Sequence, residues 1–248
     1  MERVLLQGIV MGLFLGVGVL LPRKQQSFMH PDLWINLFTG AAIFILIAPL
    51  MRFVGGNLEF FLIQLPVMPA WLQLVLSFLL LDFCRYWLHY AHHRVPFLWR
   101  FHRVHHSSEN LDATSGLRMH AFDFVQLALL PIVLFGILID TTSFAEWVIP
   151  TALSIGVFFD AFQHANISFP IGHPLGRLWH SFLNNPHFHI WHHTADGKEI
   201  DGNYSNTLVI WDRIFGTDVT QNDVPSALGL GHAPLKNSLL DLQLLKRR

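Results

Sequence analysis

Residues 70–93 have the sequence AWLQLVLSFLLLDFCRYWLHYAHH, in which an apolar first half leads to three histidines at the end. A membrane-spanning helix needs about 20 mostly apolar residues, a length that residues 70–90 reach. In a helix, His89, His92 and His93 lie on one face, because residues three and four positions apart are neighbours. Histidine is the commonest metal ligand in proteins. This stretch therefore predicts a transmembrane helix with metal ligands at one end.

Apolar segments of similar length recur along the chain. The first could also be a secretory signal peptide, but it is long for one and lacks a small-residue cleavage site. A short polar turn at residues 140–143 separates the last two segments into a helical hairpin. The predicted spans are residues 4–21, 33–53, 70–90, 122–139 and 144–162. We therefore predict an all-α, multipass membrane helical bundle of about four to five spans.

The composition agrees with a membrane protein and excludes other classes. Hydrophobic residues make up 52% of the 248 residues and charged residues only 13%, against about a quarter in soluble proteins. A net charge of −1 offers no basic surface for nucleic acid. Cys84 is the single cysteine, which excludes a disulfide framework and any cysteine-based zinc or iron–sulfur site.

The distribution of Lys and Arg predicts the orientation, because cytoplasmic loops carry an excess of positive charge. Residues 55–69 contain no Lys or Arg, and the turn at Asp140 is acidic, so both are placed outside. Arg3 and Arg52 are the exceptions. The loops on the histidine side contain Arg23, Lys24, Arg94, Arg100, Arg103 and Arg118. We therefore predict a bacterial inner-membrane or equivalent protein with its histidine-rich helical cap in the cytoplasm.

Three histidine clusters dominate the polar part of the chain: HYAHH at 89–93, HRVHH at 102–106 and HIWHH at 189–193. For one histidine, a hydrogen-bonded structural role is the ordinary interpretation, but three such clusters indicate metal. Eight or more histidines exceed the four ligands of a tetrahedral zinc ion and predict two metals sharing a site. A zinc protease would show H-E-x-x-H, which these clusters lack. Haem does not explain dense triplets, whereas copper stays open on ligand chemistry.

Metal-bound histidines usually donate their other N–H to an acceptor. Asp82 lies seven residues before His89, and Asp160 lies four before His164. Asp212 follows the third cluster. We expect these carboxylates to accept such bonds or to add a ligand, while plain helix-end or loop carboxylates are the alternative.

A further helix is predicted in the cap, where Leu175, Leu178, Trp179, Phe182 and Leu183 recur at helical spacing. Its apolar face is suited to lie on the membrane surface or against the histidine cluster. An ordinary helix facing the core of the cap is the other interpretation.

Several stretches together resemble the fatty acid hydroxylase/sterol desaturase superfamily. They are DFCRYWLH at 82–89 leading to His93, HRVHHS at 102–107, QHAN at 163–166, NPHFHIWHHT at 185–194, Asn203-Tyr204 and LVIWDRIFGT at 208–217. The resemblance covers residues 75–220 in the family's order. It implies a multipass membrane oxygenase with two non-haem iron ions, which uses O2 as co-substrate to hydroxylate or desaturate C–H bonds of a lipid taken from the bilayer.

The resemblance also implies the site. His120, in Arg118-Met119-His120, matches an R-x-H element and is an additional candidate. His92 and His187 lie beside the motif positions. Asp160 stands where fatty acid 2-hydroxylases have another ligand histidine, which argues against that subgroup and leaves the ligand count open. The implied ligands are His89, His93, His102, His105, His106, His164, His189, His192 and His193.

We predict three parts along the chain: N-terminal transmembrane helices at 1–69, a fatty acid hydroxylase-like catalytic domain at 70–220 and a polar tail at 221–248. No cytochrome b5-like or flavin motif is seen, so we expect a separate electron donor of ferredoxin, cytochrome b5 or reductase type. A regulatory, non-catalytic metal-binding protein is the main alternative. A metal transporter is the other, although its ligands would be expected at mid-span rather than at helix ends.

Overall fold

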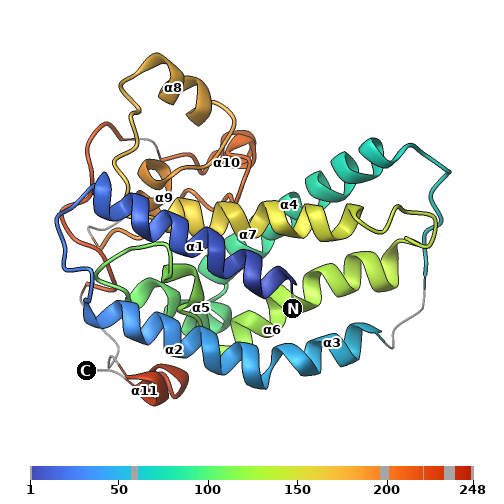
Figure 1. Ribbon diagram of the computed structural model, residues 1–248, viewed down its shortest axis with the longest axis horizontal. Helices are drawn as coiled ribbons and strands as arrows, with labels where there is room; N and C mark the ends of the chain where they lie inside the picture. The colour runs from blue at the N-terminus through green and yellow to red at the C-terminus, as the bar shows by residue number, and fades with distance from the viewer. Residues whose placement is uncertain (1, 57–60, 196–200, 220, 232–237, 247–248) are drawn as a thin grey trace.

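The computed structural model describes residues 2–56, 61–195, 201–219, 221–231 and 238–246. Within these ranges all regular structure is helical, and the β-type contacts are isolated bridges such as Pro22 to Ile167. The all-α prediction is confirmed. The long helices run side by side along the long axis of the molecule, and the short ones gather mainly at one end (Figure 1). We call this end the cap.

The long helices are α1 (Glu2–Leu20), α2 (Pro31–Leu46), α3 (Ala48–Gly56), α4 (Ala70–Arg94), α6 (Ala121–Ile132) and α7 (Val148–His164). A π-helical segment, η3 (Val133–Leu138), continues α6. Among the described residues, three apolar helical stretches are long enough to cross a membrane: Pro31–Gly56, Ala70–Arg94 and Ala121–Leu138. α1 and α7 are apolar but shorter, so the number of spans stays a prediction.

Apolar side chains of the long helices point outward. Ile45, Phe53 and Leu13 are exposed, with 71%, 70% and 57% of their surface accessible. The buried residues, by contrast, include many polar ones, among them most of the histidines. Large apolar surfaces of this kind are rare on soluble proteins and mark contact with another apolar phase. The chain is therefore a membrane protein whose polar core lies inside a lipid-facing shell.

Prolines and caps set the helix boundaries near the site. Pro31 starts α2, and the ring of His30 accepts a hydrogen bond from the backbone N–H of Leu33, which satisfies a free donor at the helix start. α4 ends at Arg94 because Pro96 disfavours helical backbone at the preceding residue. The chain turns there and begins α5, so that the histidines of both helices face each other.

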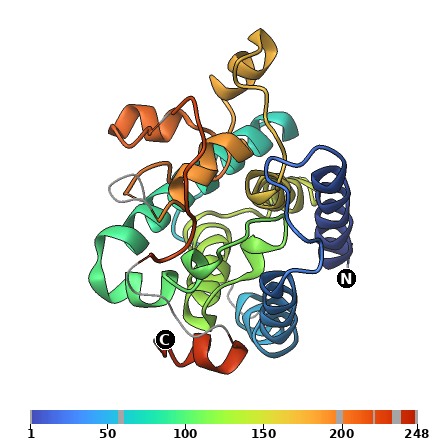
Figure 2. The same ribbon diagram turned by 90° about the vertical axis from the view of Figure 1, so that its left-hand side faces the viewer.

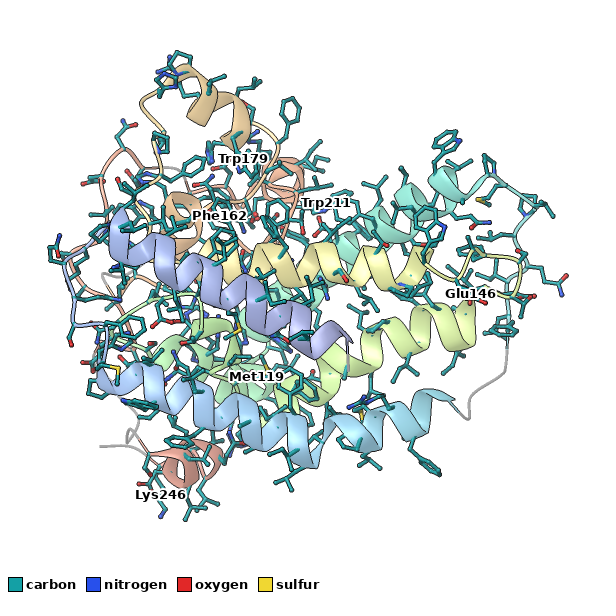
Figure 3. The ribbon with its side chains drawn as sticks, viewed as in Figure 1. Met119, Glu146, Phe162, Trp179, Trp211 and Lys246 are labelled. Carbon is teal, nitrogen blue, oxygen red and sulfur yellow. The ribbon has the colours of Figure 1, made fainter. Side chains whose placement is uncertain are left out.

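The cap contains the short helices, and Figure 2 shows α8 and α11 on opposite sides of this end. Phe162 and Trp179 lie at the cap end and Glu146 at the other end (Figure 3). α11 packs under the cap through its buried Leu242. The short helices are α5 (Pro96–His102), η1 (His105–Ser107), η2 (Ser115–Leu117), α8 (Pro174–His180), α9 (Pro186–His192), α10 (Ile210–Phe215) and α11 (Leu239–Gln243).

The predicted amphipathic helix is α8, which ends at His180 rather than at residue 183. Leu175, Leu178 and Phe182 are exposed, with 70%, 59% and 60% of their surface accessible. The ring of Trp179, on the same predicted face, packs instead against Phe162 of α7, with the ring centroids 5.8 Å apart. The predicted face is thus divided between an exposed part and a part that packs on the bundle. Contact of the exposed part with the membrane surface stays a prediction.

Candidate metal centre

Nine imidazoles converge at the cap end of the bundle. α4 and α7 deliver theirs from their last turns, and α5, η1 and α9 place the others opposite. The segment 89–93 lies in α4, whereas the segments 102–106 and 189–193 lie in or beside short helices. Each segment contributes two or three of the nine imidazoles. The nine are His89, His93, His102, His105, His106, His164, His189, His192 and His193. They are the nine residues that the family resemblance implies.

The nine imidazoles divide into two adjacent groups. Within each group, the nitrogens lie within 4.8 Å of one another. The ring centroids of His106 and His193, one from each group, are 4.6 Å apart, so the groups touch. The five-histidine group contains His89, His93, His102, His106 and His192; the four-histidine group contains His105, His164, His189 and His193.

The four-histidine group tests whether a metal fits. The Nε2 atom of His164 is 3.2 Å from that of His105 and 3.1 Å from that of His189, which is 3.1 Å from that of His193. Nitrogens bound to one metal ion at about 2.0–2.1 Å lie roughly 3.0–3.4 Å apart. The separations therefore match a shared cation.

Two rings in this group have the same tautomer, with the proton on Nδ1. Nδ1 of His164 is 2.6 Å from the carbonyl oxygen of Asp160, and Nδ1 of His105 is 3.3 Å from that of Arg118. A carbonyl only accepts, so both Nδ1 atoms donate and both Nε2 atoms carry lone pairs. Two lone pairs 3.2 Å apart repel each other unless a cation lies between them. The donor set fits a metal ion.

The five-histidine group shows the same pattern. Nδ1 of His89 donates to the carbonyl oxygen of Tyr204 at 2.7 Å, and Nδ1 of His192 to that of Gly202 at 2.7 Å. The Nε2 atoms of both rings are buried, with no hydrogen-bond partner among the described residues. A buried polar atom without a partner costs about 1–3 kcal/mol. Several such atoms aimed at one point indicate a bound cation.

Burial keeps His105, His106, His192 and His193 neutral, which is the form that binds metal. Desolvation lowers the pKa of His105, His106 and His193 well below the usual range, and neighbouring imidazoles lower these pKa values further. Burial likewise lowers the pKa of His192 to about 3. The free nitrogens are therefore unprotonated at physiological pH.

The predicted carboxylates act mostly through the backbone. Asp82 accepts hydrogen bonds from the N–H groups of Thr207 and Leu208, both at 3.1 Å, so it holds the 207–211 segment against α4. Asp212 accepts from the N–H of Tyr204 at 2.8 Å, and thereby fixes the carbonyl that receives His89. The Asp82 carboxylate thus contacts backbone and the Trp211 ring N–H rather than a histidine.

Asp160 and His120 lie outside both groups. Oδ1 of Asp160 is 3.7 Å from Nδ1 of His164, while its backbone carbonyl takes the ring proton. His120 caps α6 by accepting from the N–H of Phe122 at 3.0 Å, and its Nε2 donates to the carbonyl oxygen of Gln243 at 2.9 Å. Both ring nitrogens of His120 are thus engaged away from the centre.

The sequence analysis missed Asp123, in the first turn of α6. Its Oδ2 atom is 3.3 Å from Nδ1 of His102. Asp123 also lies close to His92, and together with His102 these residues form a third cluster of potential ligands. The signal available was the position of Asp123 three residues after His120, beside the family's R-x-H element.

A cavity of about 1300 Å³ opens directly beneath the centre. Histidines of both groups, including His89 and His164, form its cap end. Its walls are largely apolar and come from α1, α2, α3, α6 and α7, with side chains such as Ile43, Phe44 and Leu127. The cavity therefore connects the histidine groups with the lipid-facing part of the bundle.

Comparison with known proteins agrees with this site. The family model described as fatty acid hydroxylase matches residues 74–217, which include all nine histidines. The chain belongs to the fatty acid hydroxylase family. Alkylglycerol monooxygenase of Xenopus tropicalis is 34% identical over 172 residues, 65% of this chain and 34% of that protein. The chain thus spans about a third of the length of that relative.

Two further relatives of this chain carry other names. Ornithine lipid hydroxylase OlsE of Rhizobium tropici is 32% identical over 155 residues, 60% of this chain and 42% of that protein. A putative methylsterol monooxygenase of Dictyostelium discoideum is 26% identical over 196 residues, 79% of this chain and 67% of that protein. No solved structure matches the chain.

Proposed function

We propose that this chain is a membrane-bound oxygenase that binds two non-haem iron ions and hydroxylates or desaturates a C–H bond of a lipid. The proposal requires O2 as co-substrate and electrons from a separate donor. The observation that carries it is the pair of adjacent all-histidine groups at the closed end of an apolar cavity. At that boundary two metals and a lipid chain can meet.

The choice of iron rests on chemistry. Imidazole ligands suit iron, copper and zinc alike. Zinc has no redox chemistry, whereas relatives named monooxygenase and hydroxylase use oxidation. Metal analysis of the purified protein distinguishes copper from iron. Two ions are proposed because nine imidazoles exceed the needs of one ion and divide into two groups.

Each part of the chain has a role in this proposal. The nine histidines hold the metals, and the carbonyl oxygens of Tyr204, Gly202 and Asp160 orient three of the rings. When bound, a pair of iron ions supplies the activation of O2 that breaks an unreactive C–H bond. The cavity walls hold the lipid chain in place and keep water away from the reacting carbon.

The proposal also includes a route for the lipid and a side of the membrane for the electron donor. The lipid enters sideways from the bilayer, because the cavity lies among the helices that are long enough to span it. The positive-inside rule places the cap in the cytoplasm, where a ferredoxin, a cytochrome b5 or a reductase would deliver electrons.

The first experiment measures metal. The protein is purified in detergent after iron-replete expression, and iron, zinc and copper are quantified per chain for the wild type, His105→Ala and His173→Ala. His173 caps α8 and lies outside both histidine groups, so it is the matched control. We expect two irons per chain in the wild type and in His173→Ala, and loss of iron in His105→Ala.

Lipid analysis of cells that express the wild type then tests the reaction. We expect a hydroxylated or desaturated lipid that depends on O2 and disappears in His105→Ala. One zinc or copper per chain, or a metal content that His105→Ala leaves unchanged, contradicts the proposal. Such a result favours a regulatory metal-binding protein or a metal transporter.

A further inference from the structure

Two charged side chains line the cavity just beneath the histidine groups. Arg85 lies four residues before His89 in α4, and Asp160 lies four residues before His164 in α7. Four residues correspond to about 6 Å along a helix. Arg85 and Asp160 therefore each sit one helical turn below a histidine of the centre, and His89 and His164 belong to different groups.

Glycines make room for both charged groups. A Cβ atom at Gly156 would overlap the guanidinium of Arg85, and a Cβ atom at Gly116 would overlap the carboxylate of Asp160. Gly156 lies in the interior of α7, where glycine costs about 1 kcal/mol relative to alanine. The lack of a side chain at Gly156 and Gly116 thus leaves space for the charged groups of Arg85 and Asp160.

Within the described parts of the chain, neither group has a close partner of opposite charge. Arg85 forms no ion pair within 4.0 Å there, and the ring that lies 3.7 Å from the Asp160 carboxylate is the neutral imidazole of His164, whose Nδ1 proton goes to the Asp160 carbonyl oxygen. Unpaired charges beside hydrocarbon are costly and mark functional sites in membrane proteins. A plain alkyl chain against Arg85 and Asp160 would leave both groups without hydrogen bonds.

The charges nearby indicate what kind of ligand fits. Arg85 lies between the carboxylates of Asp82 and Asp160, both of which interact with it electrostatically. Because one guanidinium already faces two carboxyl groups, the site offers no free positive charge to a further anion such as a free fatty acid. A hydroxyl can donate a hydrogen bond to the carboxylate and accept one from the guanidinium. It thereby gives both groups a partner without adding a charge to the site.

We propose that Arg85 and Asp160 recognise a hydroxyl-bearing polar group of the lipid substrate, a few bonds from the C–H that reacts. This inference rests on the proposed lipid oxygenase function and names its substrate class. The polar group lies between α4 and α7, and the apolar tail fills the part of the cavity lined by Ile43, Phe44 and Leu127. The hydroxyl then fixes which carbon faces the metals.

Binding to the purified full chain in detergent tests the ligand class without any mutation. The probes are a tritiated hexadecyl glycerol ether, the same lipid with both hydroxyls methylated, and hexadecanoic acid. Hydrogen bonds to charged groups contribute about 1.5–3 kcal/mol, so the free hydroxyls should tighten binding about tenfold or more. Equal binding of the hydroxylated and methylated lipids overturns the inference.

Two variants test the residues. Gly156→Ala should displace the guanidinium while leaving α7 intact, and Arg85→Met removes the donor. In both, the preference for free hydroxyls should fall to less than about twofold, since the hydrogen bond to the guanidinium is lost. Gly12→Ala and Arg100→Met are the matched controls, because a Cβ at Gly12 meets nothing within 4 Å and Arg100 is exposed outside the cavity.

The outcomes separate this inference from the proposed function. A hydroxyl preference that survives in both Gly156→Ala and Arg85→Met overturns the assignment of the site. Because binding is measured without turnover, a chain that lacks two irons but prefers hydroxyls contradicts only the oxygenase. A chain with two irons and no preference contradicts only the polar recognition site.

Discussion

The carboxylate of Asp123 lies 3.3 Å from Nδ1 of His102, and 98% or more of the Asp123 side chain is shielded from solvent. His102 belongs to the five-histidine group, and its Nε2 faces inward without a hydrogen-bond partner among the described residues. Among the nine histidines, His102 is thus oriented by a carboxylate, whereas His89, His105, His164 and His192 bond to backbone carbonyls.

Replacing Asp123 should therefore weaken metal binding without removing a ligand. Loss of an acceptor behind a metal-bound histidine typically costs about 10–100-fold in affinity. We expect Asp123→Ala to release iron to a chelator at correspondingly lower concentration, and Asp123→Asn, which keeps an acceptor oxygen, to lose less. Titration with a chromophoric chelator measures this. Asp140→Asn, in the loop far from the cap, is the control, and equal retention by all variants would refute the role.

The sequence identified the nine histidines but not their division into groups. His105 and His106 are neighbours in η1, yet they belong to different groups, because successive side chains of a 3₁₀ helix diverge by a third of a turn. His192 and His193 separate likewise, since His193 lies at the C-cap of α9. The family resemblance fixes residue types, whereas local backbone conformation decides which histidine group each ring joins.

The partners of the outer ring nitrogens were harder to predict. Asp82 and Asp212 were expected to bond histidines, but they hold the backbone of residues 204–208. The actual acceptors for His89 and His192 are carbonyl oxygens, which every residue has and no residue type reveals. The helices themselves were predictable, because long apolar segments in a membrane protein leave few alternatives to a helix.

The two histidine groups should be separable by mutation. His189→Ala removes one of four histidines from its group, and His93→Ala removes one of five from the other. We expect iron to fall from two to about one per chain in His189→Ala, and by less in His93→Ala, because the remaining four imidazoles can still fill a four-coordinate site. Metal analysis combined with Mössbauer spectra checks this. Loss of both ions in each variant would show that the groups bind as one unit.

Acid should destabilise the metal-free protein. The pKa of His192 is about 3 in the folded chain, against 6.5 for the free side chain. Between these values the unfolded chain binds more protons, so the free energy of unfolding rises with pH and is lost as pH falls from about 6.5 toward 3. Thermal unfolding of chelator-treated protein at a series of pH values measures the slope. His192→Gln, which cannot titrate, should reduce the slope by about one proton, while His105, His106 and His193 still contribute. An unchanged slope would contradict the assignment.

The exposed face of α8 predicts contact with the membrane surface. Leu175 and Leu178 are exposed on a short helix that projects from the cap, and Phe182, two residues after its end, is exposed as well. Arg177 turns its guanidinium to the carbonyl oxygen of Gly172 at 2.9 Å. Apolar side chains on such a helix enter the boundary between headgroups and acyl chains. In Figure 1 α8 projects from the side of the cap, away from the long helices. We therefore expect α8 at that boundary.

A fluorescent probe tests this contact in a Cys84→Ser background, which removes the native thiol. A polarity-sensitive dye on Leu178→Cys should emit at shorter wavelength in lipid nanodiscs, and brominated lipids should quench it, because the probe is surrounded by acyl chains. The same dye on Arg177→Cys, one residue away on the polar side, should report water. Identical spectra at both positions would place α8 outside the bilayer, where its apolar face would serve contact with another protein instead.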